Sequence, residues 1–100
     1  MLVKLTTIHE EIVNFNAPHQ VSNSRGHKKY IIEEIFVNPQ HIVYLKEDLQ
    51  YVELHVKGNL PEGFPKGQKF TRVGFNRGNM GEEVTAIGEL AGLAKKINGE

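Results

Sequence analysis

The chain contains no cysteine among its 100 residues. Disulfide bonds and thiolate metal ligands are therefore excluded, which fits a reducing compartment. No apolar run approaches the ~20 residues that a transmembrane helix needs, and the amino terminus lacks the basic and then apolar pattern of a secretory signal. We therefore expect a cytoplasmic protein with no membrane partner.

Excess charge is also missing, because 12 acidic residues balance 12 basic ones. The totals thus give no general attraction to nucleic acid or to anionic lipid. The distribution is uneven, however: residues 54–81 hold five Lys or Arg against the single acid Glu62, a net charge of +4. This is the one positive segment of the chain.

The sequence gives little support for a catalytic site or a metal site. Asp48 is the only aspartate, and no serine or threonine stands in a nucleophile-elbow context. The five histidines are scattered, and in HEEIV the residue Val13 occupies the position where a zinc protease needs its second histidine. We expect neither an enzyme nor a bound metal or cofactor.

What is present fits one small folded domain, residues 1–100, with 39% apolar and 24% charged residues. The carboxyl end predicts a short amphipathic helix, since Leu90, Leu93, Ala94 and Ile97 recur at helical spacing before Asn98-Gly99. A chain of this length buries a thin core, so association with copies of itself would add stability.

Alternating or β-branched apolar residues predict strands over most of the remaining chain. The segments are KKYIIEEIFV (28–37), HIVYLKED (41–48), YVELHVKG (51–58), KFTRVGF (69–75) and EVTAIG (83–88). Asn38-Pro39 predicts a turn, residues 59–68 predict a loop, and Gly74 inside a strand indicates a bend or a close approach of the backbone.

The amino-terminal segment fits two structures. Leu5, Ile8, Ile12 and Phe15 have helical spacing behind a possible capping box, whereas VKLTTI and IVNFN fit two strands of a hairpin. We favour strands because β-branched residues dominate. Five or six short strands with one small helix predict a strongly bent sheet closed into a barrel, since closure removes exposed edges.

The stretch GFNRGNMG, residues 74–81, ends the positive segment. A phosphate-binding loop would need a helix after its glycines, and here a strand follows. Arg77 and Asn79 instead suit single-stranded RNA, as a phosphate contact and a base-edge contact, and Tyr44, Tyr51, Phe64 or His41 could stack on bases. A plain polar turn explains the same residues.

RVGFNRGNMGEEVTAIG, residues 72–88, resembles the second motif of Sm-like (LSm) proteins, with Arg77, Gly78, Asn79 and Met80 in the signature positions. FVNPQHIVYL, residues 36–45, resembles the first motif, with Asn38 and His41 as its turn residues. The layout is similar to that of divergent phage-encoded members of this family.

The resemblance implies a mainly β fold: a five-stranded, strongly bent Sm-like (SH3-type) barrel with one short C-terminal helix. It also implies a homo-oligomeric ring closed by edge strands, which holds short single-stranded RNA. The RNA-binding residues would be Arg77, Gly78, Asn79, Asn38 and His41. The alternative is a protein-interaction module with the same barrel that binds a peptide at an edge strand or in a groove, with Tyr44 and Tyr51 lining the groove.

Overall fold

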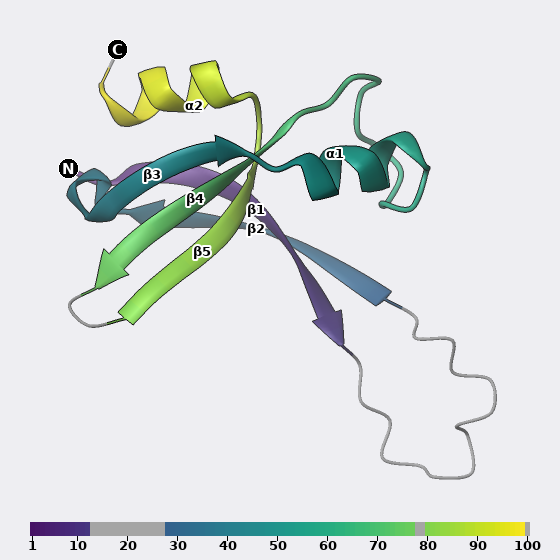
Figure 1. Ribbon diagram of the computed structural model, residues 1–100, viewed down its shortest axis with the longest axis horizontal. Helices are drawn as coiled ribbons and strands as arrows, with labels where there is room; N and C mark the ends of the chain where they lie inside the picture. The colour runs from purple at the N-terminus through teal and green to yellow at the C-terminus, as the bar shows by residue number, and fades with distance from the viewer. Residues whose placement is uncertain (13–27, 78–79, 100) are drawn as a thin grey trace, which may run out of the picture.

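A computed structural model describes residues 1–12, 28–77 and 80–99 of the chain. In chain order, the elements of the described residues are β1 (Val3–Ile12), β2 (Lys28–Val37), the 3-10 helix η2 (Pro39–His41), β3 (Ile42–Glu47), α1 (Leu49–Val56), β4 (Phe70–Arg77), β5 (Met80–Ile87) and α2 (Leu90–Ile97) (Figure 1). The prediction of a mainly β fold that ends in a short helix is confirmed for these residues. Neither α-helix is long and apolar enough to span a membrane.

The five strands form one antiparallel sheet in the order β2-β1-β5-β4-β3. The longest ladder joins β1 to β2, from Val3↔Val37 to Ile12↔Lys28. The shortest joins β1 to β5 through Thr7↔Ala86 and Ile8↔Thr85 alone. Within the described residues β2 and β3 are the two ends of the sheet and do not pair, so the sheet is open and the predicted closure into a barrel is wrong.

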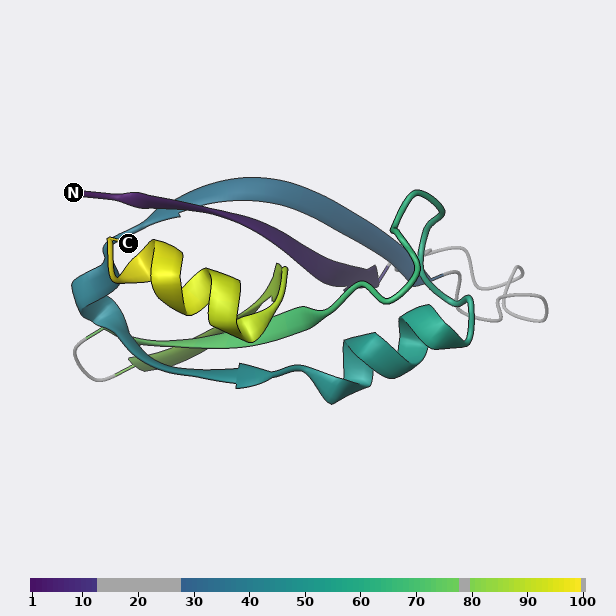
Figure 2. The ribbon, with the colours of Figure 1, turned by 90° about the horizontal axis from the view of Figure 1, so that it is seen from above.

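The sheet folds into two layers around its short ladder. β1 and β2 arc over β3, β4 and β5, and α2 runs along one side of the space between the layers (Figure 2). The main core fills this space, and Leu93 of α2 belongs to it; the buried members are Val3, Leu5, Val73, Phe75, Ala86 and Leu93. The helical spacing recognised in the sequence thus serves to cover one side of the core.

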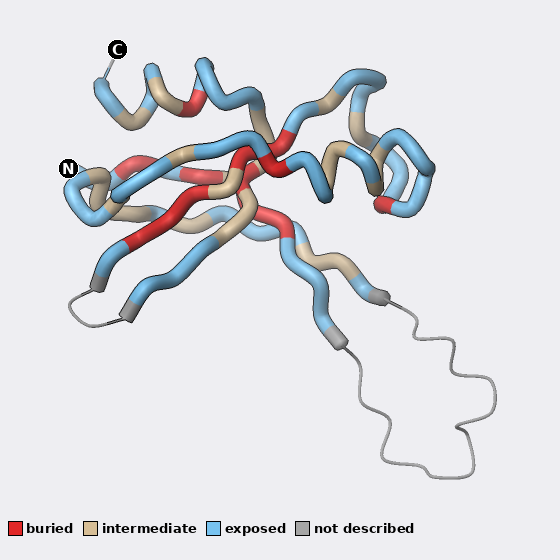
Figure 3. The backbone as a smooth tube through the Cα atoms, in the orientation of Figure 1, coloured by how far each residue is buried: buried red, intermediate tan, exposed pale blue. Residues whose placement is uncertain are grey.

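A second core lies at the other end of the molecule, beneath α1. Its buried residues are Ile8, Leu60 and Phe70, and half-buried aromatic side chains of α1 and of the loop after it pack against them. The ring centroid of Tyr51 lies 5.8 Å from the ring centroid of Phe70, and the ring centroid of Phe64 lies 5.5 Å from that of Phe70. Buried residues concentrate where β1, β4 and β5 come together (Figure 3).

The strand predicted at residues 51–58 is wrong, because Leu49–Val56 forms the helix α1. Asp48 caps the helix: its Oδ1 atom accepts a hydrogen bond from the Tyr51 backbone N–H at 3.1 Å. Val56, which the alternating pattern placed on the buried face of a strand, is 79% exposed. Alternation over only three apolar residues fits both the two-residue period of a strand and the period of a helix. The cap at Asp48 favours the helix.

The preference for strand at the amino terminus is correct in type and wrong in arrangement. Val3–Ile12 is one continuous strand, so neither a helix nor a turn occurs in it, and residues 13–16 of the second predicted strand lie outside the described residues. β2 offers ten cross-strand partners over this length, which a helix would forgo. The other strands predicted from residue 28 onward, the loop at 59–68 and the C-terminal helix are all confirmed.

Candidate functional site

The two segments singled out for RNA binding lie at the same end of the sheet. Asn38 caps η2, with its Oδ1 atom accepting a hydrogen bond from the Gln40 backbone N–H at 2.9 Å. His41 is exposed at the end of η2, and the next residue, Ile42, pairs with Phe75 of β4. Asn38 and His41 therefore lie near the end of β4, which the structure follows as far as Arg77.

The structure describes only some of the other residues that were predicted to contact RNA. Gly78 and Asn79 fall outside the described residues, and for Arg77 only the backbone is described. Tyr51 and Phe64, predicted as stacking residues, pack around Phe70 in the second core. Of the predicted stacking residues, Tyr44 and His41 are exposed.

The positive segment does not form one surface. Lys57 follows α1, at the end of the molecule opposite the end of β4, and its Nζ atom lies 2.9 Å from Glu53 Oε1 (Figure 1). Arg72 lies 3.4 Å from the buried carboxylate of Asp48 and 3.9 Å from that of Glu83. A chain segment with a net charge of +4 is thus divided among separate regions in space.

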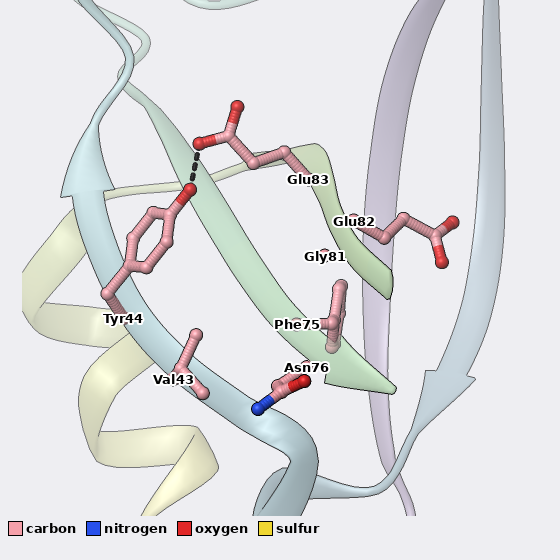
Figure 4. A pocket seen from close by; sticks show the side chains of 7 residues that line it. All are labelled: Val43, Tyr44, Phe75, Asn76, Gly81, Glu82 and Glu83. Carbon is pink, nitrogen blue, oxygen red and sulfur yellow. Dashed lines mark hydrogen bonds between the residues drawn. The ribbon is translucent and has the colours of Figure 1, made fainter. Parts of the chain in front are cut away.

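A hollow on the outer face of β3, β4 and β5 is shaped by Tyr44 and Glu83 (Figure 4). The Tyr44 hydroxyl donates a hydrogen bond to Glu83 Oε2. This bond raises the pKa of Tyr44 above its ordinary value of 10.0, because deprotonation would break it and place a second negative charge beside the carboxylate. Glu82, the neighbour of Glu83, points the other way, toward β1 and β2 (Figure 4).

A larger concavity lies between β2 and β5, and we call it the open cleft. Two adjoining hollows of about 430 Å³ and 370 Å³ form it, and both are lined by Ile35, Glu82 and Val84. The first extends to η2 and to the exposed side chains of Leu2 and Phe36, and the second extends to Thr7, His9 and Glu33. Asn38 and His41 line the first hollow, so the open cleft includes part of the predicted site.

One wall of the open cleft is a free strand edge. β5 begins at Met80, but its ladder with β1 involves only Thr85 and Ala86. Over residues 80–84 the ladder with β4 is the only one present among the described residues. Because N–H and C=O groups alternate in direction along a strand, half of those in this stretch point away from β4 with no strand to receive them.

A buried polar network fixes the point where β1 and β5 separate. The Thr85 hydroxyl donates a hydrogen bond to Asp48 Oδ2 at 2.8 Å, and the Asp48 side chain is fully buried. The other carboxylate oxygen accepts from the Tyr51 N–H and from Arg72. This network holds α1, β4 and β5 together at the inner end of the open cleft.

The open cleft is acidic. Glu33, Glu82 and Glu83 line it, and no Lys or Arg does so among the described residues. Glu83 is held by Tyr44, and Glu33 lies 3.9 Å from His9 Nδ1. The side chain of Glu82 has no hydrogen bond or ion pair with any other described residue. The two-residue period of a strand puts the side chains of Glu82 and Glu83 on opposite faces of β5.

No family model, curated protein or solved structure matches the chain. Among the residues that the structure describes, no three His, Asp or Glu side chains come together as metal ligands. The geometry of the sheet and its open cleft is therefore the basis for a functional interpretation.

Proposed function

We propose that this chain is a protein-interaction module that receives an extended segment of a partner protein in the open cleft, as an added strand along β5. The observation that carries the proposal is the free edge of β5 over residues 80–84, which runs along a concavity lined by apolar side chains. In strand addition, main-chain hydrogen bonds supply affinity and pockets for alternate side chains supply specificity.

The topology suits an added strand. β1 pairs antiparallel with β2 along ten residues but with β5 at only two pairs, and the edge of β5 over residues 80–84 therefore has room for a further strand. An added segment pairs with this edge as the next strand of the sheet. It would cover Ile35 and Val84 on the walls of the open cleft and close the side of the core opposite α2.

Removal of an apolar group from the rim tests the proposal. The probe is a fluorescent peptide of sequence Gln-Ser-Val-Ser-Gln-Ser-Val-Ser, which is uncharged and compatible with a strand. Phe36 is 64% exposed, so Phe36→Ala should preserve the fold while weakening peptide binding by about 1 kcal/mol. Fluorescence anisotropy measures the affinity.

Val56→Ala is the matched control, because Val56 is an exposed apolar residue on α1, away from the open cleft. It should leave the affinity unchanged. Equal weakening by both substitutions, or no binding of the peptide to the unaltered chain, would contradict the proposal.

A second candidate function follows from the position of η2 beside the end of β4. The pairing Ile42↔Phe75 brings Asn38 and His41 near the end of β4, the strand that leads in sequence to the predicted RNA-binding residues Arg77, Gly78 and Asn79. This is the arrangement expected of an Sm-like RNA-binding protein, in which both turns contact single-stranded RNA.

For that function copies of the chain would join through β2 and β3, the two ends of the sheet, and form a ring. Both strands carry exposed apolar side chains, Ile32 and Phe36 on β2 and Val43 on β3, which association would cover. A ring would also repeat the Arg77 turn around a common axis and so multiply its contacts with RNA.

The RNA candidate is tested with an electrophoretic shift of a uridine-rich or adenine-rich oligonucleotide. Arg77→Ala should lower the affinity and flatten its dependence on salt. The particle mass in solution should correspond to a ring. A monomer, or binding that Arg77→Ala leaves unchanged, counts against this second function.

A further inference from the structure

We propose that the open cleft selects an extended segment that carries lysine or arginine, with the cationic side chain placed at Glu82. This inference rests on the proposed function, since it names the chemistry of the segment that is added along β5. It assigns to Glu82 the role of a specificity-determining residue, and to Glu33 that of a second anionic contact across the open cleft.

Glu82 lines both hollows of the open cleft. Glu82 pairs with Phe75 across β4 and β5, and the two-residue period places it on the same face of β5 as Val84 and the buried Ala86. Its carboxylate thus extends from the core-facing side of the strand toward β1 and β2 (Figure 4). Glu82 is exposed, and none of the described residues supplies its carboxylate with a charged hydrogen-bond donor, so a lysine or arginine of the added segment can pair with it.

Glu33 of β2 supplies a second negative charge to the open cleft. Glu33 lies on β2 two residues from Ile35, and both side chains line the open cleft. Its one ionic neighbour among the described residues is His9, at 3.9 Å, and that contact is an ion pair only when the imidazole is protonated. Two carboxylates that have no neighbouring Lys or Arg in the described part of the chain attract a cationic segment and repel a phosphate backbone or an acidic peptide.

The strand period then predicts the spacing in the bound segment. Residues directly opposite each other in paired strands have side chains on the same face. A lysine placed at Glu82 is therefore followed or preceded, two positions away, by a residue placed at Val84, where Ile35 completes an apolar contact. The expected pattern is basic, any residue, apolar.

Three peptides that differ only in charge test the inference. They are Lys-Ser-Val-Ser-Lys-Ser-Val-Ser, its glutamine analogue and its glutamate analogue, each measured by anisotropy at low and moderate salt. We expect the lysine peptide to bind about fivefold more tightly than the glutamine peptide at low salt, and the glutamate peptide to bind most weakly. Salt should reduce the preference.

Glu82→Gln should abolish most of the preference for lysine while leaving the affinity for the glutamine peptide unchanged. Glu62→Gln is the matched control, because it removes an equal charge from an exposed residue in the loop after α1, and it should leave the preference intact. Circular dichroism of both variants verifies that they are folded.

The outcomes separate the inference from the function on which it rests. Equal affinity for the lysine and glutamine peptides would overturn the inference and leave strand addition standing. An unaltered preference in Glu82→Gln would overturn it by placing the cation elsewhere. Displacement of the uncharged glutamine peptide by a single-stranded oligonucleotide would overturn it in favour of nucleic acid, and failure of every peptide to bind would overturn both proposals.

Discussion

The ring of Tyr44 lies directly against the backbone of Gly74 on the neighbouring strand. The two residues pair across β3 and β4, and Gly74 pairs in turn with Glu83 across β4 and β5. A Cβ atom at Gly74 would overlap the ring. Glycine therefore lets the tyrosine lie across β4 and donate its hydroxyl hydrogen to Glu83. This row of three residues holds the Glu83 carboxylate beside Tyr44, whereas the Glu82 side chain extends toward β1 and β2 (Figure 4).

Gly74→Ala should destabilise the fold by about 1–3 kcal/mol, since the new methyl group displaces the Tyr44 ring and breaks its hydrogen bond. Urea unfolding followed by circular dichroism measures the loss. In a Tyr44→Ala background the same substitution should cost much less, because the ring is gone. Equal costs in the two backgrounds would show that the ring is not the obstacle.

The pKa of Tyr44 should fall toward 10.0 in Glu83→Gln, because the hydrogen bond to Glu83 is the main cause of its elevation. Ultraviolet titration of each chain against its Tyr44→Phe counterpart isolates this residue, which is necessary because burial also raises the pKa of Tyr51. A raised pKa stabilises the folded state in full below pH 10 and no longer does so once the pH exceeds the folded value. An unchanged Tyr44 midpoint in Glu83→Gln would contradict the assignment.

Asp48→Ala should cost roughly 3 kcal/mol in the free energy of unfolding, because it removes the cap of α1 and leaves Thr85 and Arg72 without their acceptor. Asp48→Asn keeps a side-chain oxygen for the Tyr51 N–H and should cost less. The adjacent, exposed Glu47 provides the control, since Glu47→Ala should change stability by no more than about 0.5 kcal/mol. Denaturant unfolding that ranks Asp48→Ala with Glu47→Ala would refute the structural role of the network.

The sequence predicted most strands and the C-terminal helix because their apolar periods were long enough to be unambiguous. It failed at residues 51–58, where three alternating apolar positions also fit a helix and the buried cap at Asp48 was decisive. The preferred closure into a barrel was a general argument about strand edges, whereas the observed gap depends on β1 leaving β5 after a ladder of two pairs. No local pattern encodes that separation.

The candidate site was likewise predicted only in part from the sequence. Asn38 and His41 were recognised from their turn, and the register of β3 on β4 brings them near Arg77. The open cleft was not foreseen, because its lining comes from segments distant in sequence, such as Ile35 and Val84. The available signal was the strand period at Glu82-Glu83, which already required one of the two carboxylates to face the core side of β5.

The most direct test of the central claim is amide hydrogen exchange along β5, measured by nuclear magnetic resonance with and without the lysine peptide. If a partner strand adds to β5, alternate amides between residues 81 and 84 should exchange rapidly in the free protein and become protected when the peptide is bound. Protection that appears on the free edge of β3 instead, with exchange at residues 81–84 unchanged, would contradict it.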